Sequence, residues 1–154
     1  MKHLPSRAVR RLRWLPVLLL AAPAALGQEG LQSYLPDELP WTLRRADPPL
    51  AYALLHGDPA RPGSFTFRVR ARAPHRLPPH THPDERTITV LSGTYWSGVG
   101  ERFDAAALVA YPAGSFYTVP AGLPHFSAVL EGETVFQESG IGPSGNRPVD
   151  AAAP

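Results

Sequence analysis

The chain has 154 residues and no cysteine, with a formal net charge of +2 at pH 7. This length suits one domain with one hydrophobic core, and the lack of cysteine excludes a fold held together by disulfides. The first 27 residues hold five of the 15 basic residues and none of the 13 acidic ones, so the remainder has a net charge of −3. The basic residues of that remainder are scattered arginines, which excludes the basic patch of a nucleic-acid-binding protein.

Residues 1–27 have the layout of a signal peptide, in which a basic start is followed by an apolar run. The run is shorter than the roughly 20 residues that a helix needs to cross a bilayer, and prolines interrupt it. Small residues at Ala25 and Gly27 predict cleavage before Gln28, with cleavage after Ala24 as the alternative. We therefore expect export to the periplasm or the extracellular space, with no stable membrane insertion after cleavage.

Residues 28–62 are rich in proline, which predicts an arm with short strands and no long helix. Residues 51–56 fit one such strand, and a turn follows it. Residues 65–71 then alternate between apolar side chains and arginine or threonine, which predicts a half-buried strand with charge on its solvent face.

The remaining pattern is one of short strands separated by turn residues. We expect a proline-rich loop over residues 73–79 and one helical turn within 104–110. A tight turn at Ser92-Gly93 joins the first two of the later strands. Such spacing predicts an all-β sandwich or barrel over residues 63–139, followed by a loose tail over 140–154. The expected strands after the loop cover residues 80–91, 94–99, 114–119, 125–130 and 134–138.

Three histidines are the best candidates for chemistry. His80 and His82 lie two apart on an expected strand, where a period of two points both imidazoles to the same side. His125 follows a second tight turn and offers a third ligand from elsewhere in the fold. Three imidazoles on one side are typical of a metal site with open coordination positions.

The sequence around these histidines resembles the two motifs of the cupin superfamily. The second motif is nearly complete, and the first keeps both histidines and its closing glycine. The resemblance implies a jelly-roll barrel, also called a double-stranded β-helix. It also implies that His80, His82 and His125 bind a divalent ion such as iron, manganese, nickel or zinc. The matched positions are Pro74, His80, His82, Arg86 and Gly93 in the first motif, and Gly114, Pro120, Gly122, His125 and Val129 in the second.

Arg86 stands where cupins usually offer a glutamate to the metal. It shares the phase of the apolar residues Ile88 and Val90, so it is predicted to point inward, whereas Glu85 points outward. A guanidinium about 6 Å from a divalent ion is repelled by roughly 5 kcal/mol at an effective dielectric of about 20. Either Arg86 turns to Asp84, Glu85 or solvent, or an anion bridges it to the metal.

We therefore expect an anionic small-molecule ligand, most simply a carboxylate, that Arg86 helps to bind. Asp84 and Glu138 are interpreted as ordinary surface residues, and Gln137 as a pocket residue. Two classes of function stay open at this point, a metal-dependent enzyme and a non-catalytic cupin that binds or senses a small molecule. A homodimer is compatible with either.

Overall fold

The computed structural model describes residues 30–44 and 50–149, so the predicted leader lies outside the described residues. The chain divides into two compact units, Met1–Ser33 and Tyr34–Pro154. In the first unit, residues 30–33 are a turn and irregular chain. No helix within the described ranges is long and apolar enough to cross a membrane.

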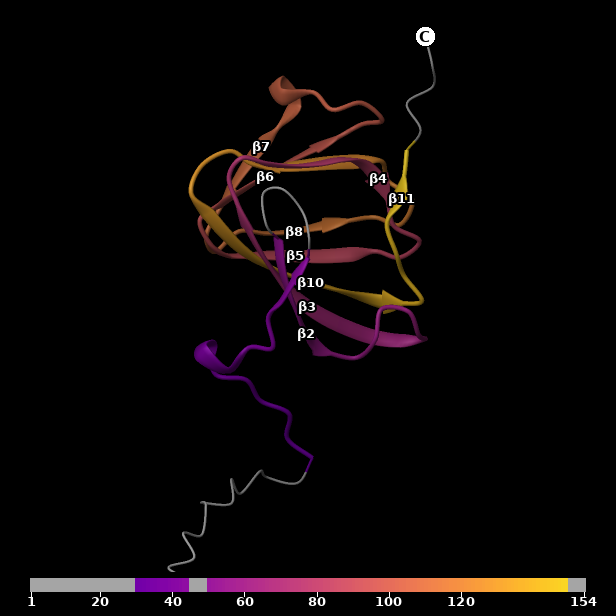
Figure 1. The fold of residues 1–154 in the computed structure, drawn as a ribbon. Coiled ribbons are helices and arrows are strands. Elements are labelled where there is room, and N and C mark those ends of the chain that lie inside the picture. The colour runs from indigo at the N-terminus through magenta and orange to yellow at the C-terminus, as the bar shows by residue number, and fades with distance from the viewer. Residues whose placement is uncertain (1–29, 45–49, 150–154) are drawn as a thin grey trace, which may run out of the picture. The chain divides into compact units, whose positions relative to one another are not determined.

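The second unit is built from two antiparallel sheets (Figure 1). One has six strands in the order β1-β2-β3-β10-β5-β8, and the other has five in the order β11-β4-β9-β6-β7. The predicted all-β class is confirmed. The strands are β1 Thr42–Arg44, β2 Leu50–His56, β3 Gly63–Arg72, β4 His75–Thr81, β5 Arg86–Ser92, β6 Thr94–Val99, β7 Val109–Pro112, β8 Phe116–Val119, β9 His125–Val129, β10 Glu133–Gly142 and β11 Arg147–Pro148.

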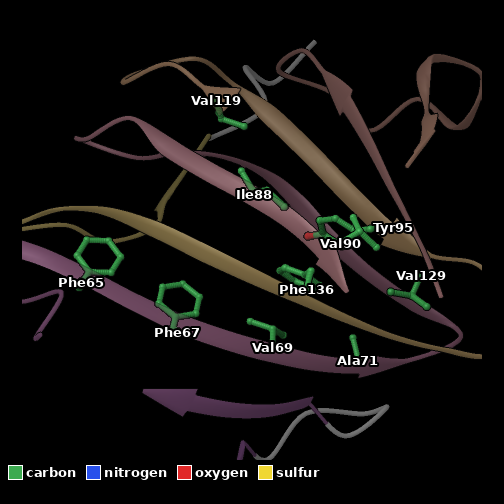
Figure 2. Packing of buried hydrophobic residues seen from close by; sticks show 10 residues of the cluster. All are labelled: Phe65, Phe67, Val69, Ala71, Ile88, Val90, Tyr95, Val119, Val129 and Phe136. Carbon is green, nitrogen blue, oxygen red and sulfur yellow. The ribbon is translucent and has the colours of Figure 1, made fainter. Parts of the chain in front are cut away.

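The core forms between the two sheets because their strands alternate. On β3 the side chains at positions 65, 67, 69 and 71 are buried and those between them are not, as predicted. Tyr95 of β6 and Val129 of β9 meet this layer from the other sheet (Figure 2). Tyr95 also stacks on Phe136 of β10 with 4.1 Å between ring centroids. Burying each such side chain stabilises the fold by about 1.5–3 kcal/mol.

Two predictions about the chain around His80 and His82 were wrong. The expected loop over 73–79 is mostly strand, because β4 begins at His75 and passes through Pro78 and Pro79. Its pairing with β9 shifts register between Leu77 and His80, and such a bulge tolerates prolines, which have no N–H to donate. The expected strand over 80–91 is two strands, with His82 in the loop between β4 and β5.

The single helical turn expected within 104–110 is present as Ala105–Ala107, a 3-10 turn (η2), and β7 follows it. Two further boundaries need correction. The tail is not loose over 140–149, because β10 runs to Gly142 and β11 pairs with β4. The expected barrel start at residue 63 is also too late, since β2 of the proline-rich arm pairs along β3.

Candidate metal centre

The three predicted histidines come together inside the second unit. His80 of β4 lies directly opposite His125 of β9, and His82 follows the end of β4. The ring centroids are 4.2 Å apart for His80 and His125, 4.9 Å for His80 and His82, and 5.0 Å for His82 and His125. All three residues are buried, and one nitrogen from each lies within 4.8 Å of the others.

The backbone fixes which nitrogen each histidine can offer. Nδ1 of His80 lies 2.9 Å from the carbonyl oxygen of Pro78, and Nδ1 of His125 lies 2.9 Å from that of Leu123. Nδ1 of His82 lies 3.0 Å from the carbonyl oxygen of Gly145. A carbonyl only accepts hydrogen bonds, so each Nδ1 carries the proton and each Nε2 keeps its lone pair.

This donor set fits a divalent ion. Metal-bound histidines commonly donate their second ring N–H to a carbonyl, which orients the ring and raises its basicity. Nitrogens bound at about 2.0–2.1 Å to one tetrahedral or octahedral ion lie about 3–3.4 Å apart, so modest ring movements complete the site. Three ligands leave coordination positions open for water or for an organic molecule.

Burial keeps these imidazoles neutral. Burial, with a smaller contribution from the charge of Arg86, lowers the pKa of His80 and of His82 to about 4. Burial also lowers the pKa of His125. A neutral imidazole is the form that binds a metal, so no proton has to be displaced near neutral pH.

We expect the metal-free protein to become less stable as the pH falls from 6.5 towards 4. In that window the unfolded chain binds protons at these histidines and the folded chain does not, so unfolding is favoured. Glu138 has the opposite effect on the free energy of unfolding between about pH 4.5 and pH 6, because burial raises its pKa to about 6. The three histidines together should outweigh this single carboxyl group. Thermal unfolding at pH 7.5 and pH 5 checks this, and an equal or higher midpoint at pH 5 would contradict it.

Arg86 points inward, as its phase on β5 predicted, and it is only 3% exposed. Its Nη1 donates to Oε2 of Glu138 at 2.9 Å, and its Nη2 donates to Oγ of Ser144 at 2.7 Å. Its Nε lies 3.0 Å from Oδ2 of Asp84, a charge contact without hydrogen-bond geometry. The guanidinium also lies 4.9 Å from the ring centroid of Phe65.

The interpretation of Asp84 and Glu138 as surface residues was therefore wrong. Their side chains are 8% and 16% exposed, and both form ion pairs with Arg86. Gly140 of β10 makes room for Asp84, since a Cβ there would collide with its carboxylate. The interpretation of Gln137 as a pocket residue was also wrong. Its Oε1 accepts a hydrogen bond from Nε of Arg68 at 3.0 Å, and Gln137 is not among the residues that line the cavity beside His80 and His82.

A cavity of about 510 Å³ lies beside His80 and His82. His80, His82, Arg86 and Glu138 contribute its polar wall, together with Ser144 and its neighbours. Strands β2, β3, β6 and β10 contribute an apolar wall of aliphatic and aromatic side chains. The apolar residues that these four strands contribute are Leu50, Tyr52, Phe67, Val69, Ala71, Tyr95 and Phe136.

No protein-family model matches the sequence, and no curated protein matches it. Solved structures match in fold. The polyketide cyclase RemF from Streptomyces resistomycificus has a TM-score of 0.63 at 15% identity, covering 79% of this chain and 87% of that one. An uncharacterized protein with a double-stranded β-helix domain from Klebsiella pneumoniae has a TM-score of 0.54 at 17% identity, covering 79% and 94%.

The DMSP lyase DddQ from Ruegeria pomeroyi has a TM-score of 0.51 at 18% identity, covering 68% of this chain and 49% of that one. Identities this low show the fold alone. The chain has a double-stranded β-helix fold, the fold that the resemblance to cupins predicted.

Proposed function

We propose that this protein is a metal-dependent cupin that acts on an anionic small molecule. The observation that carries the proposal is that one ring nitrogen from each histidine lies within 4.8 Å of the others, while a carbonyl oxygen accepts a hydrogen bond from each Nδ1 and so leaves each Nε2 as the free donor. Imidazole ligands suit iron, nickel and zinc, and manganese is the fourth candidate. The proposal includes export with cleavage before Gln28, which the N-terminal sequence of protein recovered outside the cytoplasm would test.

Charge favours an anion as the ligand. Three neutral histidines leave both positive charges of a divalent ion uncompensated. Arg86, Asp84 and Glu138 together add at most one net negative charge, so the occupied site keeps a positive charge. A carboxylate oxygen bound to the ion would neutralise it.

Arg86 can still contribute to that binding. A guanidinium has five N–H donors, and among the described residues hydrogen-bond partners at Glu138 and Ser144 account for two of them. Nε lies against Asp84, but Arg86 lines the cavity, so a ligand there can use the second N–H of Nη1 or of Nη2. The apolar wall of the cavity suits a ligand whose anionic head is joined to a ring or an alkyl body.

Glu138 favours an enzyme over a binding or sensing protein. Its carboxyl lines the same cavity as His80 and His82, and burial raises its pKa to about 6. A carboxyl with such a pKa can accept or donate a proton near neutral pH. Two fold neighbours, a cyclase and a lyase by name, are enzymes. A ligand recovered unchanged after long incubation with the metal-loaded protein would support the non-catalytic alternative.

Calorimetric titration of chelator-treated protein tests the proposal. We expect one of Fe²⁺, Mn²⁺, Ni²⁺ or Zn²⁺ to bind with a stoichiometry of one per chain. Benzoate should then bind the metal-loaded protein more tightly than acetate, which lacks an apolar body, and than benzamide, which lacks the charge. Failure to bind any of the four ions would refute the metal site, and equal binding of benzoate and benzamide would refute the anionic ligand.

A further inference from the structure

The segment after β10 lies against β4, the strand that carries His80. We call this segment, residues 143–149, the C-terminal strap. Its strand β11 pairs with β4, placing Arg147 opposite Thr81 and Pro148 opposite His80 (Figure 1). Beyond β11, the N–H of Val149 donates to the carbonyl oxygen of Pro79 at 3.0 Å. The strap is therefore an edge of the five-stranded sheet.

The strap also orients one of the three candidate metal ligands. His80 and His125 bond to carbonyls two residues earlier in the chain, so their rings are oriented by their own local segments. His82 differs, because its Nδ1 donates to Gly145, which is 63 residues away. The orientation of His82 thus depends on where the strap lies.

Ser144 holds the strap at this place. Its Oγ accepts from Nη2 of Arg86 at 2.7 Å and donates to Asp84. Its N–H donates to the carbonyl oxygen of Pro59 at 2.7 Å. Ser144 is thus tied to two separate segments, one at Asp84 and Arg86 and the other at Pro59. The next residue is Gly145, whose carbonyl oxygen holds His82.

The same residues form part of the cavity. Ser144, Gly145 and Asn146 line it together with His80, His82 and Arg86. A displacement of the strap would change both the orientation of His82 and the shape of the space in which a ligand binds.

We propose that Ser144 is a positioning residue of the metal centre, which fixes the C-terminal strap so that Gly145 holds His82 with its Nε2 toward the ion. Its effect on metal binding rests on the function proposed above. Its effect on the ring of His82 does not, because the hydrogen bonds that produce it need no metal.

Two measurements on Ser144→Ala test this, with Ser139→Ala as the matched control. Ser139 is a β10 serine that bonds to Thr66 on the far side of the strand from Glu138. In Ser144→Ala we expect Zn²⁺ affinity to fall by up to about 100-fold, because a displaced strap weakens the hydrogen bond from His82 to Gly145, and losing such a partner outright costs about 10- to 100-fold. Ser139→Ala should bind Zn²⁺ as the wild type does, and Ser144→Thr, which keeps the hydroxyl, should recover most of the affinity.

The second measurement is nitrogen NMR of the histidine rings in chelator-treated protein. Wild-type His82 should be in the Nδ1–H tautomer, and Ser144→Ala should show a mixture of tautomers for His82 while His80 and His125 stay unchanged. Val149→Pro, which removes the N–H bonded to Pro79 and leaves the contacts of Arg86 intact, should show the same selective change. It provides the test if Ser144→Ala does not fold.

The outcomes separate the two proposals. If the wild type binds no metal while His82 alone changes tautomer, the metal site is refuted and the positioning role stands. If the wild type binds Zn²⁺ and the folded variant binds it equally well, Ser144 has no positioning role. An unchanged His82 tautomer in both strap variants would refute the role whether or not metal binds.

Discussion

Replacing any one of His80, His82 and His125 with alanine is expected to remove the bound metal. Each replacement deletes a ligand, so affinity should fall by more than the roughly 10- to 100-fold that outer-shell changes cost. The fold should survive, because the apolar core is formed by other residues, and the carbonyl left without its donor costs only about 1–3 kcal/mol. Elemental analysis after dialysis against a slight excess of the preferred ion, together with circular dichroism, measures both effects.

His56→Ala is the matched control for that experiment. His56 ends β2 and bonds through Nε2 to Oγ of Ser64 at 3.2 Å, outside the histidine cluster. This variant should retain as much metal as the wild type. If the wild type retains no more metal than His125→Ala does, the three histidines are structural residues only.

Strand alternation predicted most of the fold from the sequence. It placed the inner face of β3 correctly, and on β5 it put Arg86 inside and Glu85 on the surface. It failed for β4, because Pro78 and Pro79 look like loop residues when the sheet around them is unknown. Their place in a strand depends on a bulge against β9, and no local pattern specifies that long-range pairing.

The partners of Arg86 could have been found in part. On β10, Thr134 and Phe136 are buried, and Glu138 has the same phase, whereas Gln137 has the opposite one. The argument that placed Arg86 inside would therefore also have placed Glu138 inside and Gln137 outside. Ser144 and Gly145 carried no such signal, because they reach the histidines only when the chain returns to pair with β4.

Arg86→Glu is expected to destabilise the metal-free protein strongly and to increase its dependence on metal. The change places a third carboxylate beside Asp84 and Glu138, and breaking a buried ion pair in this way costs about 3–5 kcal/mol. By the cupin resemblance, a glutamate at this position is a metal ligand, so a divalent ion would supply the missing positive charge. Thermal unfolding with and without the preferred ion should show a larger metal-induced rise in midpoint for Arg86→Glu than for the wild type.

Arg68→Glu controls for the change of charge. Arg68 bonds to Gln137 on the outer side of β3, so this variant has the same altered charge without altering the site. Its metal-induced rise in midpoint should equal that of the wild type. Benzoate titration into the metal-loaded proteins then separates two roles of Arg86. If Arg86 contacts the ligand, benzoate should bind Arg86→Glu more weakly than the wild type, with Arg68→Glu unchanged. Equal binding by all three proteins would mean that its donors act only within the network of Asp84, Glu138 and Ser144, which would refute ligand binding by Arg86.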